Sequence, residues 1–176
     1  SVERRSGQTA MHAILEALVR MLAPVLCFTA EEIWQYLPHA EGDNSESIQL
    51  NSWPVLVPEH RDAALAGRWE QLLEVRDVVL KALEEARNRK EIGQSLQAKV
   101  RLTAAGDQLA FLRQAEALLP TVFITSQVEL AEGDELTATV LPADGEKCER
   151  CWTYATSVGA DADHPAVCAR CAATLR

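Results

Sequence analysis

The first part of the chain places hydrophobic residues three and four positions apart, which is the period of an amphipathic helix. Over residues 4–22 one helix face collects Ala10, Ile14, Leu15, Leu18, Val19 and Leu22. A second helix is predicted to begin near Thr29, which fits a capping box with Glu32. Pro38 is expected to end it, because proline cannot continue a helix.

A third and longer helical pattern covers residues 61–90, and Gly93 is expected to end it. Before it, residues 39–47 are polar and acidic, which is typical of a loop, and residues 48–54 fit a short extended segment. Cys27 lies between the first two helices, where we expect a small buried hydrophobic residue. These segments predict a helical, bundle-like N-terminal half.

The hydrophobic period changes after the third helix. Residues 98–103 alternate apolar and polar side chains, which predicts a strand. Asp107 can cap a helix that continues to residue 119 and is closed by Pro120. Further strands are predicted at residues 122–125, 128–130 and 136–141. This order of elements is typical of a small α+β module with an antiparallel sheet.

Four of the five cysteines form two Cys-x-x-Cys pairs near the end of the chain, Cys148 with Cys151 and Cys168 with Cys171. Two such turns can supply four sulfur ligands in a tetrahedron, so the spacing predicts one structural Zn²⁺ ion. A closed four-sulfur shell leaves no position for substrate, and we therefore expect no catalytic residue here. Few large hydrophobic residues surround the pairs, so folding of this segment should depend on the metal.

Iron in a rubredoxin-like site is the alternative to zinc. Such sites usually carry glycine directly after each cysteine pair, where this chain has Trp152 and Ala172. His164 lies between the two pairs, but four cysteines already complete the shell, so we expect a solvated loop residue. Zinc is therefore the expected metal.

These patterns predict a mixed fold class with three domains. Residues 1–93 form the helical region, residues 94–141 the α+β module, and residues 142–176 a zinc finger with four cysteine ligands. No internal repeat or low-complexity segment interrupts this order.

The formal net charge of -9 argues against a protein that coats nucleic acid through bulk electrostatic attraction. No apolar run approaches the roughly 18–20 residues that span a bilayer, so we expect no membrane partner. The chain also lacks the pattern of a signal peptide, and thiols paired for metal suit a reducing compartment. We therefore expect a cytoplasmic protein.

Arg150 and Trp152 flank Cys151, and two interpretations of this pair are open. They are either a surface charge and a ring packed over the metal turn, or a guanidinium and an indole that contact an unpaired base. Arg170 in the second turn could add to such a contact. Residues 142–176 contain four basic and five acidic side chains, so any contact with nucleic acid must be local.

The basic run that ends the third helix is equally open to two interpretations. Arg87 and Lys90 belong either to a solvated helix end or to a contact with a phosphate backbone. The sequence pattern alone does not separate the two.

Several stretches together resemble a known family. Residues 24–34 have the pattern Pro-x-x-x-Phe-Thr-x-Glu-Glu-x-Trp, which is shared by the synthetases for branched aliphatic amino acids, and residues 81–96 are similar to their junction helix. Phe-Ile-Thr-Ser-Gln-Val at 123–128 and Gly-Glu-Lys-Cys-Glu-Arg-Cys-Trp at 145–152 are similar to one member specifically. By these motifs the whole chain resembles the bacterial isoleucyl-tRNA synthetases.

The resemblance implies a part of an enzyme that attaches isoleucine to tRNA(Ile) with ATP. The family's nucleotide-binding signatures and editing domain are absent, so it implies a C-terminal fragment with no catalysis of its own. It also implies that the zinc module reaches the anticodon loop, with Arg150 and Trp152 in contact. The expected partners are the tRNA(Ile) anticodon loop and the rest of the synthetase chain, and the expected state is a monomer.

Two alternatives differ in class. A DNA-repair glycosylase tail carries a related zinc finger, but this interpretation leaves the helical half unexplained. A purely structural module, in which the metal only holds the end of the chain, needs no nucleic acid at all.

Overall fold

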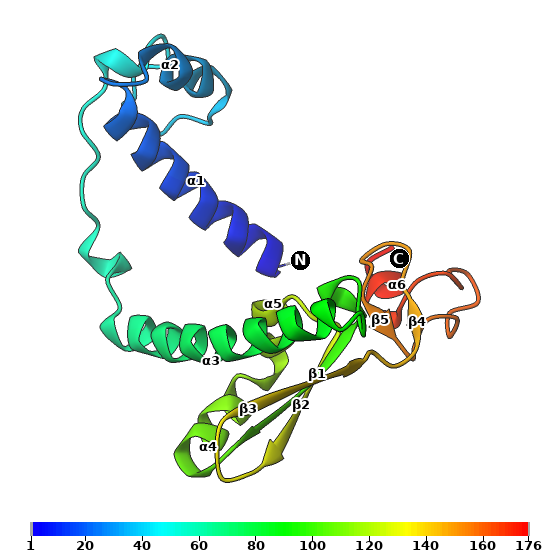
Figure 1. Cartoon of the computed structure of the whole chain (residues 1–176). Coiled ribbons are helices and arrows are strands. Elements are labelled where there is room, and N and C mark those ends of the chain that lie inside the picture. Colours follow the sequence, from blue (N-terminus) through cyan, green and yellow to red (C-terminus); the bar gives the residue numbers. More distant parts are fainter. Residues whose placement is uncertain (1, 176) are drawn as a thin grey trace. The chain divides into compact units, whose positions relative to one another are not determined.

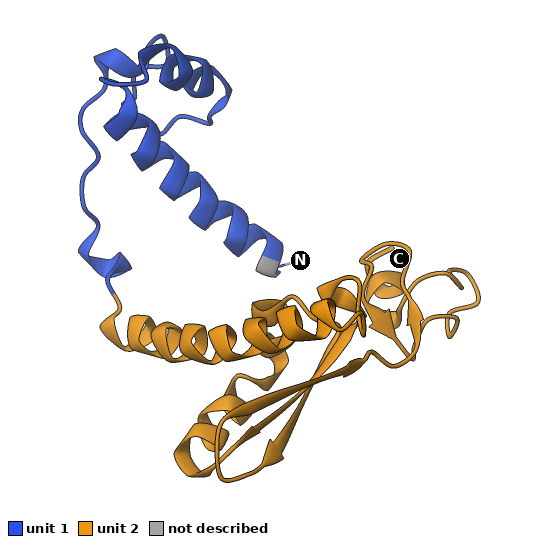
Figure 2. Ribbon diagram, viewed as in Figure 1, with its two compact units in different colours: residues 1–61 blue, residues 62–176 orange. Residues whose placement is uncertain are grey.

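The computed structural model describes residues 2–175, which form two compact units divided between residues 61 and 62: unit 1 before this point and unit 2 after it (Figures 1 and 2). The mixed fold class is confirmed, because helices, small sheets and a cysteine cluster are all present. The three domains expected at 1–93, 94–141 and 142–176 stay a prediction. No helix in the described part is long and apolar enough to cross a membrane.

Unit 1 contains two α-helices, α1 (Val2–Leu22) and α2 (Cys27–Tyr36), and two short 3-10 turns, Ile48–Leu50 and Pro58–His60. Its core is small and consists of Val19, Ala23, Ala30, Trp34 and Ile48. The extended segment expected from residue 48 begins instead as a 3-10 turn, because the Ser47 side chain accepts a hydrogen bond from the Gln49 N–H.

Two predictions for the start of α2 are wrong. The helix begins at Cys27, and its N-cap residue Leu26 has no capping side chain, so Thr29 lies inside the first turn and forms no capping box. The neighbouring Glu31 carboxylate accepts hydrogen bonds from the Ser47 hydroxyl and the Ile48 N–H, which connects α2 to the loop after it. Cys27 is exposed rather than buried, because it opens the helix away from the Trp34 core.

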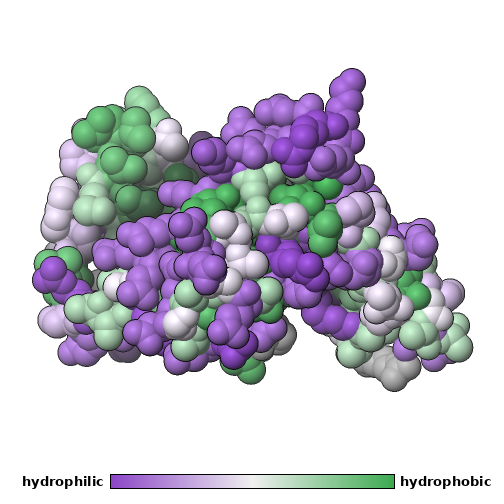
Figure 3. Space-filling model, turned by 60° about the horizontal axis from the view of Figure 1, so that its bottom comes forward, coloured by the Kyte–Doolittle hydropathy of each residue, from purple (hydrophilic) through white to green (hydrophobic). Residues whose placement is uncertain are grey.

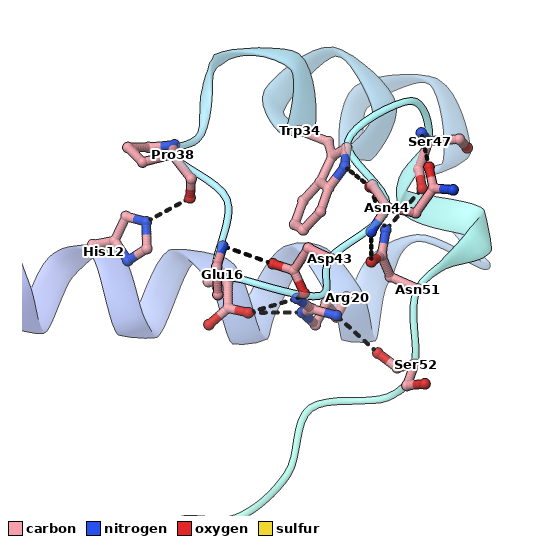
Figure 4. Close-up of polar contacts among 11 residues, drawn as sticks. His12, Glu16, Arg20, Trp34, Pro38, Asp43, Asn44, Ser47, Asn51 and Ser52 are labelled. Atoms are coloured by element: carbon pink, nitrogen blue, oxygen red, sulfur yellow. Dashed lines mark hydrogen bonds and ion pairs between the residues drawn. The ribbon is translucent and has the colours of Figure 1, made fainter.

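A polar network joins the loop after α2 to α1 (Figure 4). The Arg20 guanidinium donates to Glu16 at 2.8 Å, to Asp43 at 2.7 Å and to the Ser52 carbonyl at 3.2 Å. Burial opposes the charge of Arg20, but the hydrogen bonds and charges of Asp43 and Glu16 outweigh it and raise the Arg20 pKa. The Trp34 indole donates to the Asn44 carbonyl at 2.9 Å. This loop is therefore a structured part of unit 1.

Unit 2 begins with the long helix α3 (Ala63–Asn88), which Asp62 caps by accepting a hydrogen bond from the Leu65 N–H at 2.8 Å. The expected stop at Gly93 is wrong. Lys90 takes the left-handed conformation with a φ of 60°, and the Glu91 N–H closes onto the Ala86 carbonyl. The left-handed residue therefore lies three positions before Gly93, and the helix itself ends at Asn88.

The main sheet of unit 2 has three strands, β1 (Ala98–Ala104), β2 (Gln127–Glu132) and β3 (Thr137–Pro142), in the order β2-β1-β3. The antiparallel expectation is wrong for one pair: β1 and β2 run parallel, and β1 and β3 antiparallel. The segment between β1 and β2 supplies the crossover, with α4 (Gly106–Gln114), a 3-10 turn (Glu116–Leu118) and α5 (Leu119–Phe123).

The strand predicted at residues 122–125 is also wrong, because this segment belongs to α5 and its end. Pro120 fits the first turn of α5, where its missing N–H needs no partner, so it opens a helix instead of closing one. Ile124 then ends α5 in the left-handed conformation with a φ of 57°.

Helices cover one face of this sheet, where alternate residues of β1 are buried (Figure 1). The core takes its other residues from α3, α4 and α5, including Val79, Leu83, Leu112, Leu119 and Phe123. The opposite face of the strands carries polar residues such as Arg101. Hydrophobic side chains on the face drawn in Figure 3 gather in separate patches among hydrophilic ones.

The end of the chain forms a metal module, which we define as residues 145–175. It contains β4 (Glu146–Lys147), β5 (Tyr154–Ala155) and α6 (Ala169–Leu175), with β4 and β5 antiparallel. Gly145 has a φ of 85°, and a side chain there would lie 2.3 Å from the Ala155 backbone. The hairpin therefore closes tightly against the start of the module.

Candidate functional site

The four paired cysteines meet at one point in the metal module. The sulfurs of Cys148, Cys151, Cys168 and Cys171 all lie within 4.8 Å of one another, and the Cys151 and Cys168 sulfurs are 3.8 Å apart. Zn–S bonds of about 2.3 Å in a tetrahedron place two sulfurs roughly 3.8 Å apart. The cluster can thus hold one metal ion, and its dimensions fit zinc.

Backbone hydrogen bonds shape the first cysteine turn. The Cys148 N–H donates to the Thr153 carbonyl at 2.9 Å, and the Trp152 N–H donates to the Cys148 carbonyl at 2.8 Å. Both bonds close the chain around Cys151 and place Trp152 in the left-handed conformation with a φ of 65°. Such a conformation costs a bulky residue about 1–2 kcal/mol, so the backbone at Trp152 lowers the stability of the turn by about this amount.

The second cysteine pair lies at the start of α6. The Cys168 N–H donates to the Cys148 sulfur at 3.3 Å, which joins the two turns directly. The Ala172 N–H donates to the Cys168 carbonyl at 2.9 Å, and the Ala169 N–H donates to the Ser157 hydroxyl at 3.2 Å. Cys168 and Cys171 are buried by this arrangement.

The electrostatics of the cluster are uneven. Burial opposes ionisation of Cys151, but hydrogen bonds from the Thr153 hydroxyl and backbone lower its pKa to about 6. Burial raises the pKa of Cys168 to about 11, and the neighbouring sulfurs add to the effect. The protein alone therefore favours a thiolate at Cys151 and opposes one at Cys168. A bound cation would remove this opposition, because it neutralises charge that the crowded sulfurs repel.

Arg170 lies beside the cluster. A hydrogen bond to the Cys151 sulfur, reinforced by the charge of that sulfur, raises the Arg170 pKa. Its guanidinium is thus engaged with the metal turn, although the residue as a whole is exposed. The Arg170 guanidinium and the Thr153 hydroxyl thus both interact with the Cys151 sulfur.

Trp152 and Arg150 are both exposed on the first turn, and 61% of Trp152 is accessible. The structure adds Lys147, whose ammonium lies 5.7 Å from the centroid of the Trp152 ring. Sequence reasoning did not single out Lys147, although its position directly before Cys148 was a usable signal. The module thus displays two cations and one aromatic ring together.

Arg87 and Lys90 lie at the end of α3. The Arg87 guanidinium donates to the Ser95 hydroxyl at 3.0 Å, and Lys90 is exposed in its left-handed turn. The Ser126 hydroxyl joins Leu96, the residue after Ser95, to Tyr154 of the metal module. The end of α3 and the metal module therefore lie at the same end of the sheet.

Two family models match segments of this chain. Residues 1–102 match the family model described as the anticodon-binding domain of tRNA ligase. Residues 145–173 match a model described as a zinc finger found in FPG and IleRS. The second match covers all four paired cysteines.

Similar curated proteins carry the name isoleucine–tRNA ligase. The proteins of Syntrophotalea carbinolica, Geobacter sulfurreducens and Desulforamulus reducens are 52%, 44% and 45% identical over 99%, 99% and 100% of this chain. The chain spans about a fifth of the length of these relatives, 20% of each. Since the family model covers more than half of its residues, the chain belongs to the family of anticodon-binding domains of tRNA ligases.

Proposed function

We propose that this chain is the tRNA-recognition region of an isoleucine–tRNA ligase, the enzyme that attaches isoleucine to tRNA(Ile) with ATP. The observation that carries the proposal is the exposed Trp152, held in a strained turn beside Arg150. An exposed ring in a costly conformation is typical of a functional position. The similarity to isoleucine–tRNA ligases supports the choice of amino acid.

In this proposal one Zn²⁺ ion is bound by Cys148, Cys151, Cys168 and Cys171 and has a structural role. The ion holds the first turn rigid, while the Trp152 ring stacks on an unpaired base of the anticodon loop. Such stacking contributes about 1–3 kcal/mol per base. The chemistry of amino-acid activation belongs to the rest of the ligase chain, which is the second proposed partner.

The cations have different proposed roles. Arg150 and Lys147 contact phosphates or base edges next to the stacked base. Arg87 and Lys90, at the same end of the sheet, contact the backbone further along the tRNA. Arg170 contributes less directly, because its guanidinium is engaged with Cys151.

Aminoacylation kinetics of the complete ligase that contains this chain test the proposal. We expect Trp152→Ala to lower kcat/KM for tRNA(Ile) by about tenfold to a hundredfold, equivalent to the loss of one stacked base. ATP–pyrophosphate exchange with isoleucine should not change, because that reaction needs no tRNA. Ile124→Ala is the matched control, since Ile124 is similarly exposed, at 56%, has a similar φ of 57° and lies outside both matched segments. Equal charging of tRNA(Ile) by wild type and Trp152→Ala would contradict the stacking role of Trp152 and favour a purely structural module.

The glycosylase alternative predicts a different ligand. It requires tight binding to a DNA duplex, and it accounts only for residues 145–173. The match over residues 1–102 favours the ligase. Preference for duplex DNA over tRNA(Ile) in a competition assay with the chain would reverse this choice.

A further inference from the structure

The metal module follows β3 along the chain and is joined to the sheet by one covalent connection, residues 142–145 (Figure 1). A body tied to another at a single joint can rotate about it. Trp152 would then point in many directions, and only a fraction of molecules would present it to a ligand. The contacts that prevent this rotation decide where the ring points.

Ser126 ties the module to the sheet at a second point. Its hydroxyl donates to the Leu96 carbonyl at 2.5 Å and accepts a hydrogen bond from the Tyr154 N–H at 2.7 Å. The Ser126 N–H itself donates to the Ala98 carbonyl at 3.2 Å, which anchors the residue beside β1. The Ser126 hydroxyl thus connects the turn before β1 with strand β5 of the module, and its N–H connects the residue to β1.

Gln127 fixes the covalent joint itself. Its side-chain amide donates to the Asp144 carbonyl at 3.0 Å and accepts from the Asp144 N–H at 2.8 Å. Lys99, the partner of Gln127 in the β1–β2 register, forms an ion pair with the Asp144 carboxylate at 2.8 Å. A backbone bond from Ala143 to Gln97 at 2.8 Å adds to the same anchor. Both the backbone and the carboxylate of Asp144 in this connection are therefore bonded to the sheet.

We infer that Ser126 and Gln127 are positioning residues, which orient the metal module on the sheet and so aim Trp152. The two neighbours hold the two ends of one hairpin: Gln127 holds Asp144 before β4, and Ser126 holds Tyr154, two residues after Trp152. Two separated ties remove the rotation that one joint allows. This role in tRNA recognition rests on the proposed function, whereas the orientation of the module does not.

Backbone ¹⁵N relaxation of the zinc-loaded chain tests the orientation directly. The double variant Ser126→Ala/Gln127→Met removes the side-chain hydrogen bonds of both residues while keeping side-chain size close to the original, and it leaves the Lys99–Asp144 ion pair and the Ala143–Gln97 backbone bond in place. Ser157→Ala is the matched control, because it removes a hydrogen bond inside the module without touching the sheet. Ser126→Thr in place of Ser126→Ala restores the hydroxyl and should restore the tie.

In wild type and in Ser157→Ala we expect the amides of residues 145–175 and of the main sheet to tumble with one correlation time. In the double variant the module amides should show a correlation time about twofold shorter than the sheet amides, with one zinc per chain retained. A single common correlation time in the double variant would overturn the inference. Loss of zinc or of the β4–β5 amide pattern would also overturn it, because the residues would then support the fold of the module and not its direction.

Aminoacylation by the complete ligase tests the consequence for recognition. We expect the double variant to raise KM for tRNA(Ile) about five- to tenfold, as the competent orientation becomes a minority, with isoleucine activation unchanged. If Trp152→Ala lowers kcat/KM but the double variant does not, the positioning role in recognition is wrong. If Trp152→Ala itself has no effect, the proposed function fails, and the relaxation result alone decides whether the two residues orient the module.

Discussion

Unit 1 and the metal module are both too small to build a large hydrophobic core, and they reach a fixed structure by different means. Unit 1 buries Trp34 among four smaller hydrophobic residues and pins its long loop with the Arg20 network. The metal module buries cysteines where a core would otherwise contain leucines or phenylalanines. Small segments need such additions, because burial alone offsets little of the conformational entropy.

The difference lies in how stability is distributed. In unit 1 it is divided among a buried indole, three hydrogen bonds of one guanidinium and several loop contacts, so no single loss removes the fold. In the metal module one centre connects both turns, so the loss of one component affects every residue around it. Single mutations in unit 1 should therefore each lower its stability by part of the total, whereas loss of the metal centre should unfold the whole metal module.

Metal removal should give the largest effect. Chelation of zinc, or Cys168→Ser, should unfold residues 145–175, because metal binding contributes on the order of 10 kcal/mol to structural zinc sites of this kind. The amide signals of the module should collapse to unfolded positions in an NMR spectrum, while those of α1 and α2 keep their dispersion. Metal analysis should find one zinc per chain before chelation.

Cys27→Ser is the matched control for that experiment, since Cys27 is an exposed thiol of unit 1 outside the cluster. It should leave both the zinc count and the module spectrum unchanged. If the module stayed folded without metal, the claim that its fold depends on one metal centre, unlike that of unit 1, would be wrong.

Trp34→Ala should give the second largest effect, now in unit 1. The indole is fully buried, and its N–H donates to the Asn44 carbonyl. Loss of a buried aromatic side chain costs about 3–5 kcal/mol, and the carbonyl also loses a partner. Urea unfolding followed by the α1 and α2 amides should show the loss, with residues 145–175 unaffected. A change below about 1 kcal/mol, the range of an ordinary hydrogen bond, would mean that the polar network alone sustains unit 1.

The local features of this molecule could be predicted from sequence. The cysteine spacing predicted a cluster, because ligand geometry depends on a few neighbouring residues in each turn. The first and third helices follow the helical period closely. The strand at residues 98–103 was found because one of its faces is buried and the other is not.

The rest depends on contacts between distant residues. The parallel pairing of β1 and β2 arises because the chain between them returns over the sheet, which a propensity pattern does not encode. Pro120 was interpreted as an end because proline both opens and follows helices, and only the packing of Phe123 into the core decides between them. Ser126 carries no special signal, since its partners lie 30 residues before and 28 residues after it.

Acid should weaken unit 1 through Asp43. The hydrogen bond from Arg20 lowers the Asp43 pKa, and Ala40 adds a backbone bond. A carboxyl with a lowered folded-state pKa stabilises the fold fully above its unfolded value of about 3.9, and loses this contribution as the pH falls through the folded value. Asp43→Asn should therefore cost about 1.5–3 kcal/mol at pH 7, the range for a hydrogen bond to a charged group.

The stability gap between wild type and Asp43→Asn should then narrow as the pH falls from about 5 toward about 2. The indole N–H signal of Trp34 reports on unit 1 alone and separates this change from metal loss. Glu41→Gln, which changes an exposed carboxylate in the same loop, is the control and should show no gap at any pH. If the difference in unfolding free energy between wild type and Asp43→Asn stayed constant with pH, the effect of the substitution would come from packing or hydrogen-bond geometry and not from the charge of Asp43.

Lys147→Met should give the smallest effect and the sharpest test of how the metal module differs from unit 1. The ammonium lies 5.7 Å from the Trp152 centroid, an exposed cation–π contact that contributes about 0.5–1 kcal/mol. Methionine keeps the length of the side chain but removes the charge, so the module should stay folded with its zinc. In unit 1, by contrast, Arg20 supports structure, and Arg20→Met should lower stability.

In the proposed function Lys147 contacts the tRNA. Lys147→Met should therefore raise KM for tRNA(Ile) about two- to fivefold and flatten the salt dependence of KM, while the unfolding midpoint of the module shifts little. A marked loss of stability with unchanged KM would show that the charges of both regions serve structure.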